Sequence, residues 1–194
     1  MLASDLNTLL DQVRSCQLCK AHIPEPRPVL RACQSAKVLV IGQAPGTKVH
    51  ASGIPWDDAS GRRLRRWMGV TDAEFYDTSH IAIVPMGLCY PGKGKSGDLP
   101  PRPECAPAWH AEVFKRLPNI ECTLLIGQYA QNYYAAGNHK TLTSRVTDWQ
   151  KFAPSRVVLP HPSPRNELWL RKNPWFEREV VPYLQSTIRA LLCV

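Results

Sequence analysis

Four short apolar runs divide the chain, each bounded by polar or glycine-containing segments. The runs occupy 37–41, 81–84, 122–128 and 156–159. They are too short for buried helices and have the length of buried strands. Longer segments between them place apolar residues three and four positions apart, which is the spacing of an amphipathic helix. The sequence therefore predicts strands that alternate with helices.

The predicted helices cover 4–15, 60–69, 106–116, 128–136 and 175–192. In the first, Leu6, Leu9, Leu10 and Val13 share one face, and Ser4 or Asp5 supplies the N-cap. The proline-rich segment 21–36 predicts an extended crossing of the surface, and 42–60 and 90–104 predict loops.

Strands alternating with helices form parallel sheets that are covered on both faces. We therefore predict an α/β protein with three α/β/α layers around a central four-stranded parallel sheet. A chain of 194 residues is long enough for one domain with a sizeable core. We expect a single domain over residues 1–194, with the N-terminal helix and segment 1–36 packed on it.

Polar loops follow three of the predicted strands: G-Q-A-P-G at 42–46, P-M-G-L-C at 85–89 and H-P-S-P-R-N at 161–166. The carboxyl ends of parallel strands meet at one edge of a sheet, where open α/β folds place their sites. The three loops therefore predict one composite site. Neither a G-x-G-x-x-G motif nor a phosphate loop is present, which argues against a nucleotide-binding protein.

The net charge of +8 favours a polyanionic partner, and nucleic acid before a membrane surface. No apolar run approaches the roughly 18 residues of a membrane span. The first residues lack a secretion signal, so we expect a cytoplasmic, nucleoid-associated protein of bacterial type. Four arginines at 62, 63, 65 and 66 point mostly outward in the predicted helix, where they either contact phosphates or form a solvated face.

The loops at 42–61 and 161–166 together resemble those of the uracil-DNA glycosylase superfamily. G-Q-A-P-G is followed by G-I-P-W-D-D-A-S-G, and H-P-S-P-R-N closes the site. The resemblance runs from Cys16 to about Asn166 and mixes features of the iron–sulfur-containing family four and family five branches. It implies an enzyme of base excision repair that flips uracil, or a related deaminated base, out of DNA and hydrolyses its N-glycosidic bond.

The resemblance also implies roles for individual residues of the opening and closing loops. Trp56 stacks on the flipped base, although a core or lid tryptophan is the alternative. His161 hydrogen-bonds the base oxygen and stabilises the leaving anion. Gln43, with the backbone of Gly42 and Ala44, positions the base and the attacking water.

The carboxylate that related enzymes often carry in the first loop is missing at positions 43 and 44. Asp58 is the first candidate for this role and Asp57 the second, although Asp58 is equally suited to cap the following helix. Pro85 stands about where related enzymes have an asparagine that reads uracil. The backbone of Met86 and Gly87 is the expected substitute.

The expected DNA contacts lie in the closing loop. Ser163 and Pro164 meet a phosphate and the backbone, and Arg165 either reaches DNA or fills the vacated stack. Asn166 contacts DNA or only holds the loop. Arg62 is the DNA contact expected from the arginine helix.

Four of the seven cysteines match, in spacing, the ligands of the 4Fe–4S cluster in families four and five: Cys16, Cys19, Cys89 and Cys105. Four thiolates suit either an iron–sulfur cluster or zinc, and spacing alone does not separate them. The resemblance favours the cluster, with zinc or free thiols as alternatives.

Two functional alternatives remain open. One is a DNA-lesion-binding protein of the same fold with weak or absent catalysis, which the missing carboxylate and Pro85 favour. The other is a glycosylase for another base, such as hypoxanthine. In each case the expected partner is DNA with a deaminated base, and we expect a monomer.

Overall fold

The computed structural model describes residues 5–95, 97–135, 137 and 139–192. Its central sheet is parallel throughout and has the order β2-β1-β5-β6. The strands are β1 (Val38–Ile41), β2 (Ile81–Ile83), β5 (Cys122–Ile126) and β6 (Arg156–Leu159). The predicted fold class and all four predicted strands are confirmed. The third strand ends at Ile126, two residues earlier than expected.

The longer helices of the fold are α1 (Leu6–Arg14), α3 (Ala59–Met68), α6 (Gly127–Tyr134) and α9 (Val181–Leu192). The shorter ones are α2 (Thr47–Ser52), α4 (Asp72–Tyr76), α5 (Ala111–Lys115), α7 (Leu142–Thr147) and α8 (Glu167–Lys172). Single π-helical turns at Ala106–His110 and Phe176–Val180 lead into α5 and α9. Short 3-10 turns are found at Trp149–Lys151 and Pro164–Asn166. Among the described residues, no helix is long and apolar enough to cross a membrane.

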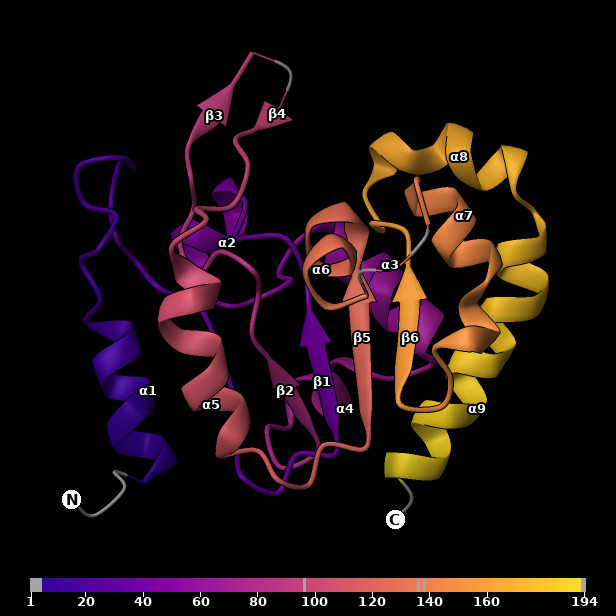
Figure 1. Cartoon of the computed structure of the whole chain (residues 1–194), viewed down its shortest axis with the longest axis horizontal. Helices are drawn as coiled ribbons and strands as arrows, with labels where there is room; N and C mark the ends of the chain where they lie inside the picture. Colours follow the sequence, from indigo (N-terminus) through magenta and orange to yellow (C-terminus); the bar gives the residue numbers. More distant parts are fainter. Residues whose placement is uncertain (1–4, 96, 136, 138, 193–194) are drawn as a thin grey trace.

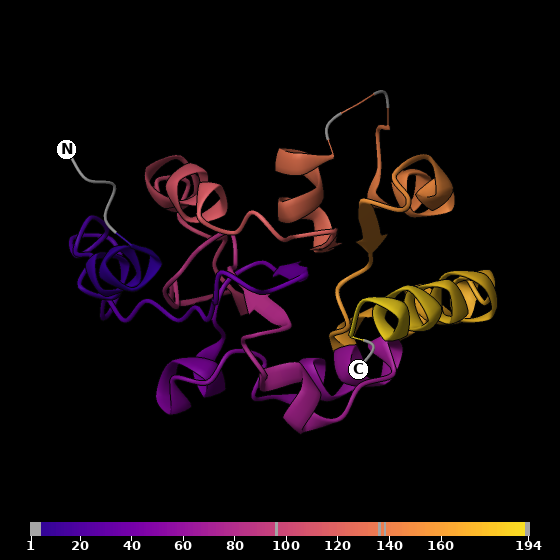
Figure 2. The same cartoon turned by 90° about the horizontal axis from the view of Figure 1, so that it is seen from below.

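Helices cover both faces of the sheet, as the sequence predicted. Helices α5, α6 and α7 lie on one face, with α1 packed outside α5, and α3, α4 and α9 lie on the other (Figures 1 and 2). Asp5 caps α1 by accepting a hydrogen bond from the amide of Thr8; Ser4, the alternative cap, lies outside the described residues. The four apolar side chains predicted for α1 are buried.

The segment before β1 covers the edge of the sheet. Arg31 pairs with Ile83 of β2 through two backbone hydrogen bonds, at 2.7 and 3.0 Å, and the amide of Val29 donates to the carbonyl of Leu88. Val29 and Leu30 are buried against this edge, whereas residues 21–28 are mostly exposed or half-buried, so the predicted surface crossing holds for the first part of the segment. Pairing here protects a strand edge that would otherwise be open to another chain.

Both predicted loops contain regular structure. Residues 42–60 include helix α2, and residues 90–104 include a hairpin of β3 (Lys93–Gly94) and β4 (Gly97–Asp98). The hairpin rises beyond the carboxyl edge of the sheet (Figure 1). Sequence patterns missed these elements because each is only a few residues long and rich in glycine or polar residues.

The strand order places a topological switch point between β1 and β5. From β1 the chain crosses to β2 on one side, and from β5 it crosses to β6 on the other. Connections that diverge in this way leave a crevice at the carboxyl ends of the two central strands, where ligands bind in open α/β sheets. The loop that begins at Gly42 and helix α6, which begins at Gly127, start from this crevice.

Candidate active site

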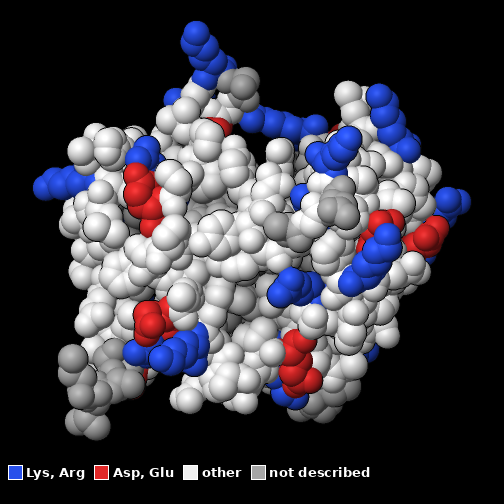
Figure 3. Space-filling view, viewed as in Figure 1, with Lys and Arg blue, Asp and Glu red and all other residues white. Residues whose placement is uncertain are grey.

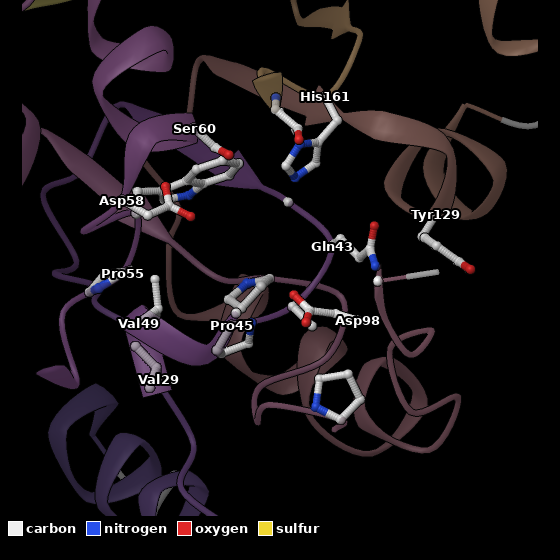
Figure 4. A pocket seen from close by; sticks show the side chains of 18 of the residues that line it. Val29, Gln43, Pro45, Val49, Pro55, Asp58, Ser60, Asp98, Tyr129 and His161 are labelled. Atoms are coloured by element: carbon white, nitrogen blue, oxygen red, sulfur yellow. Dashed lines mark hydrogen bonds between the residues drawn. The ribbon is translucent and has the colours of Figure 1, made fainter. Parts of the chain in front are cut away.

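A cavity of about 510 Å³ opens at the carboxyl edge of the sheet. Its volume lies in the range of small-molecule sites. Nine of the residues predicted for the site line it: Gly42, Gln43, Ala44, Trp56, Asp58, His161, Ser163, Arg165 and Asn166. The opening and closing loops therefore meet across one cavity, as the composite-site hypothesis expected. Figure 4 shows Gln43, Asp58 and His161 reaching into it from different sides.

Trp56 has the left-handed backbone conformation, with φ of 59°, which non-glycine residues seldom adopt. Two glycines make room for it. A Cβ on Gly42 would lie 2.6 Å from the indole Cζ2, and one on Gly61 would lie 1.7 Å from the Trp56 carbonyl oxygen. The spacing of glycines in the opening loop thus follows from where this indole and its backbone lie.

Arg65 holds the backbone of this turn. Its side chain is buried, pairs with Asp72 at 2.6 Å and donates to the carbonyl of Trp56 at 3.3 Å. Tyr76 donates its hydroxyl to the neighbouring carbonyl of Pro55 at 3.1 Å. The expectation that the arginines of α3 point outward is therefore wrong for Arg65. Its position in the stripe of Gly61, Leu64 and Met68 is the sequence signal that indicates an inward side chain.

His161 follows β6 and is half-buried, 5.7 Å from Trp56 between ring centroids, with 33° between the ring planes. Burial lowers the pKa of His161, and the negative charge of Asp58 partly offsets this effect. The amide of Ser163 donates to Nδ1 at 3.2 Å. Nδ1 is therefore the acceptor of a neutral ring, and the proton resides on Nε2. His161 thus has one N–H donor, at Nε2.

Asp58 is the N-cap of α3, and one of its oxygens accepts a hydrogen bond from the amide of Gly61 at 2.7 Å. Asp58 therefore caps α3, which was one of the two roles that the sequence allowed for it. Capping occupies one carboxylate oxygen, and the side chain still lines the cavity, where its charge acts on His161. Asp57 is exposed and is not among the described lining residues.

The strand end at Pro85 and Met86 differs from what the sequence suggested. Met86 is buried and does not line the cavity; its amide donates to the carbonyl of Gly42 at 3.0 Å. The amide of Gly87 likewise donates to the carbonyl of Gln43 at 2.9 Å. Both amides are therefore already used within the fold, whereas the side chain of Gln43 lines the cavity.

The closing loop is held by its own side chains. Asn166 donates from Nδ2 to the carbonyl of His161 at 2.7 Å and so supports the loop, and it lines the cavity together with Arg165 and Ser163. Pro164 and Arg62, the latter on α3, are exposed and do not line the cavity. Arg63 links the same helix to the loop region through Glu167 at 2.9 Å.

Three polar lining residues were not predicted from the sequence: Ser60, Asp98 and Tyr129. Tyr129 follows the end of β5 by three positions, so its place at the carboxyl edge was open to prediction from the strand. Asp98 comes from the hairpin, and no sequence pattern indicated that the hairpin reaches the cavity.

The four cysteines of the predicted cluster come from three separate segments of the chain. Cys19 and Cys105 are buried, and Cys16 and Cys89 are half-buried. Burial, together with a smaller effect of the other thiols of the set, raises the pKa of Cys89 to about 12 and that of Cys105 to about 11. Trp109 donates its indole N–H to the sulfur of Cys16 at 3.3 Å. In the described part of the chain, no three His, Cys, Asp or Glu side chains are arranged to hold a single metal ion.

Lysine and arginine side chains stand along the carboxyl edge in Figure 3, around the hairpin and α8, with few acidic side chains among them. Exposed basic residues of these elements and of the turn before α8 include Lys93, Lys95, Arg165, Arg171 and Lys172. The mouth of the cavity is therefore flanked by positive charge, which favours a phosphate-bearing ligand.

A comparison with known protein families agrees with this geometry. The family model for the uracil DNA glycosylase superfamily matches residues 31–185. The matched region includes the whole sheet and both loops that line the cavity, and it begins after Cys16 and Cys19. Members of this superfamily generally hydrolyse N-glycosyl bonds, and their fold implies DNA as a partner. This chain belongs to the uracil DNA glycosylase superfamily.

Proposed function

We propose that this protein excises uracil, or a related deaminated base, from DNA by hydrolysing the N-glycosidic bond in base excision repair. The observation that carries the proposal is the pairing of His161 with Trp56 across the cavity. A neutral imidazole whose one N–H is Nε2 faces an indole at 5.7 Å, and both lie in a cavity flanked by positive charge.

Trp56 supplies the surface on which a flipped base stacks. Extruding a base from the duplex costs a few kcal/mol. Stacking on an aromatic side chain returns about 1–3 kcal/mol per base. Because Gly42, Gly61 and Arg65 fix the indole before any ligand arrives, little further ordering is needed on binding.

His161 stabilises the charge that develops on the base. As the glycosidic bond breaks, its electron pair moves to the base, and the carbonyl oxygens of uracil take up negative charge. A fixed N–H donor at such an oxygen is worth most where it is pre-oriented and shielded from water. The Ser163 amide and the Asn166 side chain provide that orientation.

The sugar becomes cationic in the same step, as in other glycoside cleavages. Asp58 keeps one carboxylate oxygen after capping α3 and lines the cavity opposite Gln43. We assign to Asp58 the support of the cationic sugar. The amide of Gln43 contacts the base edge, since neither Met86 nor Gly87 has a free amide there.

We also propose that the thiols of Cys16, Cys19, Cys89 and Cys105 hold a 4Fe–4S cluster. The fit lies in the donor set, four thiols from three segments that influence one another's pKa. Such a cluster would tie the end of α1 to the segments around 89 and 105. The visible absorption of iron–thiolate bonds, with iron and sulfide analysis, separates it from colourless d¹⁰ zinc.

The proposed activity is tested with a panel of oligonucleotides, each carrying one uracil, hypoxanthine or xanthine, in single- and double-stranded form. The expected result is release of free uracil and an abasic site. His161→Ala is expected to lower the single-turnover rate by about 10²–10³-fold, the usual loss of one charge-stabilising donor. Unmodified DNA of the same sequence is the control.

Binding to lesion-containing DNA without release of any base would contradict the enzyme and favour a lesion-binding protein. Release of hypoxanthine but not uracil would favour the second candidate, a glycosylase for another base. The observation in favour of that candidate is Pro85, which leaves the strand end without a side-chain reader for uracil.

A further inference from the structure

We infer that Asp98, carried by the β3–β4 hairpin, is the carboxylate that orients and deprotonates the attacking water. The inference rests on the proposed hydrolysis and adds a catalytic residue to it. Asp98 lines the cavity, and in Figure 4 its carboxylate reaches inward on the side away from Asp58.

The hairpin brings Asp98 between the two loops of the site. On one side, its Oδ2 lies 3.3 Å from where a Cβ on Gly46 would stand, at the end of the opening loop. On the other, the preceding residue, Gly97, contacts Arg165 so closely that a Cβ would lie 2.1 Å from Nη1. The amide of Leu99 closes the hairpin on the carbonyl of Gly92 at 2.9 Å. The carboxylate is therefore placed by contacts with both loops.

Asp98 also differs from Asp58 in its hydrogen bonds. One oxygen of Asp58 accepts the hydrogen bond that caps α3. Within the described residues, the Asp98 side chain has neither a hydrogen bond nor an ion pair. A carboxylate that lines a cavity without a partner is available to accept a proton. The side chain at position 43, where the resemblance led us to expect a carboxylate, is the amide of Gln43.

The bond between C1′ and the base nitrogen breaks, and its electron pair leaves with the base, which His161 stabilises as an anion. A water oxygen forms the new bond to C1′ of the cationic sugar. The proton of that water passes to Asp98 and returns to solvent, and the base anion takes up a proton when it is released. Two carboxylates on different sides of a cationic sugar have separate roles, as in O-glycoside hydrolysis.

The test compares single-turnover release of uracil by wild type, Asp98→Asn and Glu121→Gln. Glu121 is exposed before β5, at the opposite edge of the sheet, and serves as the matched loss of one carboxylate. Asp98→Asn is expected to lower the rate by about 10²-fold or more, the usual contribution of a general base. Its Kd for uracil-containing DNA is expected to stay equal or fall slightly, because one negative charge near phosphates is removed. Formate is expected to restore part of the rate of Asp98→Ala.

The outcomes separate the two proposals. If wild type releases uracil and Asp98→Asn does so within about twofold of its rate, the role of Asp98 is overturned while the proposed function stands. A rate loss that matches a loss of DNA affinity also overturns it, since the residue then acts in binding. If wild type releases no base from any substrate, the proposed function fails, and the role of Asp98 fails with it. Thermal unfolding of each variant checks that the fold is retained.

Discussion

At the scale of single residues, Trp56 combines an unfavourable backbone with a fixed side chain. A left-handed conformation of this kind costs of the order of 1–3 kcal/mol and persists only where the surroundings determine it. Arg65 and Tyr76 provide those surroundings by binding the carbonyls of Trp56 and Pro55. The strain lies at the cavity, where an indole fixed in advance favours binding of a flipped base.

The close contact between Gly42 and the indole of Trp56 leads to a prediction for Gly42→Ala. Because the new Cβ would meet Cζ2 at 2.6 Å, we expect the indole to shift and the fold to lose about 1–3 kcal/mol, as in other overpacked sites. Base release should fall with it. In a Trp56→Ala background the same substitution should cost little more, so a double-mutant cycle by urea denaturation shows coupling. Equal costs in both backgrounds would contradict the contact.

The lowered pKa of His161 leads to a prediction about pH. The ordinary pKa of a histidine is 6.5, and burial lowers that of His161. The ring therefore takes up its second proton only at a pH below 6.5, and the acid limb of base release should lie in that range. Because the charge of Asp58 raises the pKa of His161, Asp58→Asn should move the ring titration to lower pH. An NMR titration of the His161 ring measures this shift separately from turnover. An upward shift in Asp58→Asn would mean that the two groups are not coupled as described.

At the scale of elements, the closing loop depends on one side chain that binds a backbone carbonyl. We predict that Asn166→Ala lowers base release about fivefold, because a hydrogen bond worth roughly 1 kcal/mol no longer orients the backbone of His161. Asn173→Ala is the matched control. It removes a similar bond, 2.8 Å from Nδ2 to the carbonyl of Trp169, and also the bond that the Trp175 indole donates to Oδ1 at 3.2 Å, in a turn that does not line the cavity. Stability should fall in both variants and turnover only in the first.

The elements differ in how far the sequence predicts them. The four strands are buried runs of apolar residues, so their positions follow from composition to within two residues. Helices α2, α4, α7 and α8 have five or six residues each, too few to show a helical period. For Arg65, two sequence signals disagree. Its place in the helical repeat of α3 predicts an inward side chain, whereas its charge suggests an outward one. The ion pair with Asp72 allows the charged side chain to be buried.

At the scale of the whole molecule, the cavity unites residues that the chain keeps far apart. Loops at strand ends were predictable as partners, because the carboxyl ends of parallel strands share an edge. Asp98 was not, because its place depends on the contacts of Gly97 with Arg165 and of its own carboxylate with Gly46. Such contacts between loops leave no periodic signal, so the sequence did not indicate that Asp98 joins Asp58 in the cavity.

The charge around the cavity predicts salt-dependent binding. Each phosphate neutralised by Lys or Arg contributes about 0.9 to the slope of log K against log salt for duplex DNA. Lys93→Gln with Lys95→Gln, both exposed on or beside the hairpin, should lower that slope by up to about 2. Lys115→Gln, exposed at the end of α5, is the control and should leave it unchanged. Fluorescence anisotropy at several salt concentrations measures the slopes; equal slopes would mean that the hairpin does not meet phosphates.

A buried histidine links the stability of the whole fold to pH. His110 donates from Nε2 to the carbonyl of Pro85 at 3.1 Å and accepts from the hydroxyl of Tyr134 at 2.5 Å. It is 2% exposed, and burial lowers its pKa from 6.5 to about 4. Since the unfolded chain binds a proton here at higher pH than the folded one, stability falls as pH drops through 6.5, and the loss is complete near pH 4.

The size of this effect follows from the shift in the His110 pKa, which corresponds to roughly 3 kcal/mol of unfolding free energy lost across that range. His110→Phe should be less stable than wild type at pH 7, because the carbonyl of Pro85 and the hydroxyl of Tyr134 lose their partner. Its stability should nevertheless change less between pH 7 and pH 4, because the group that titrates is gone. Urea denaturation of both proteins over this range tests the prediction, and parallel curves would show that His110 does not carry the pH dependence.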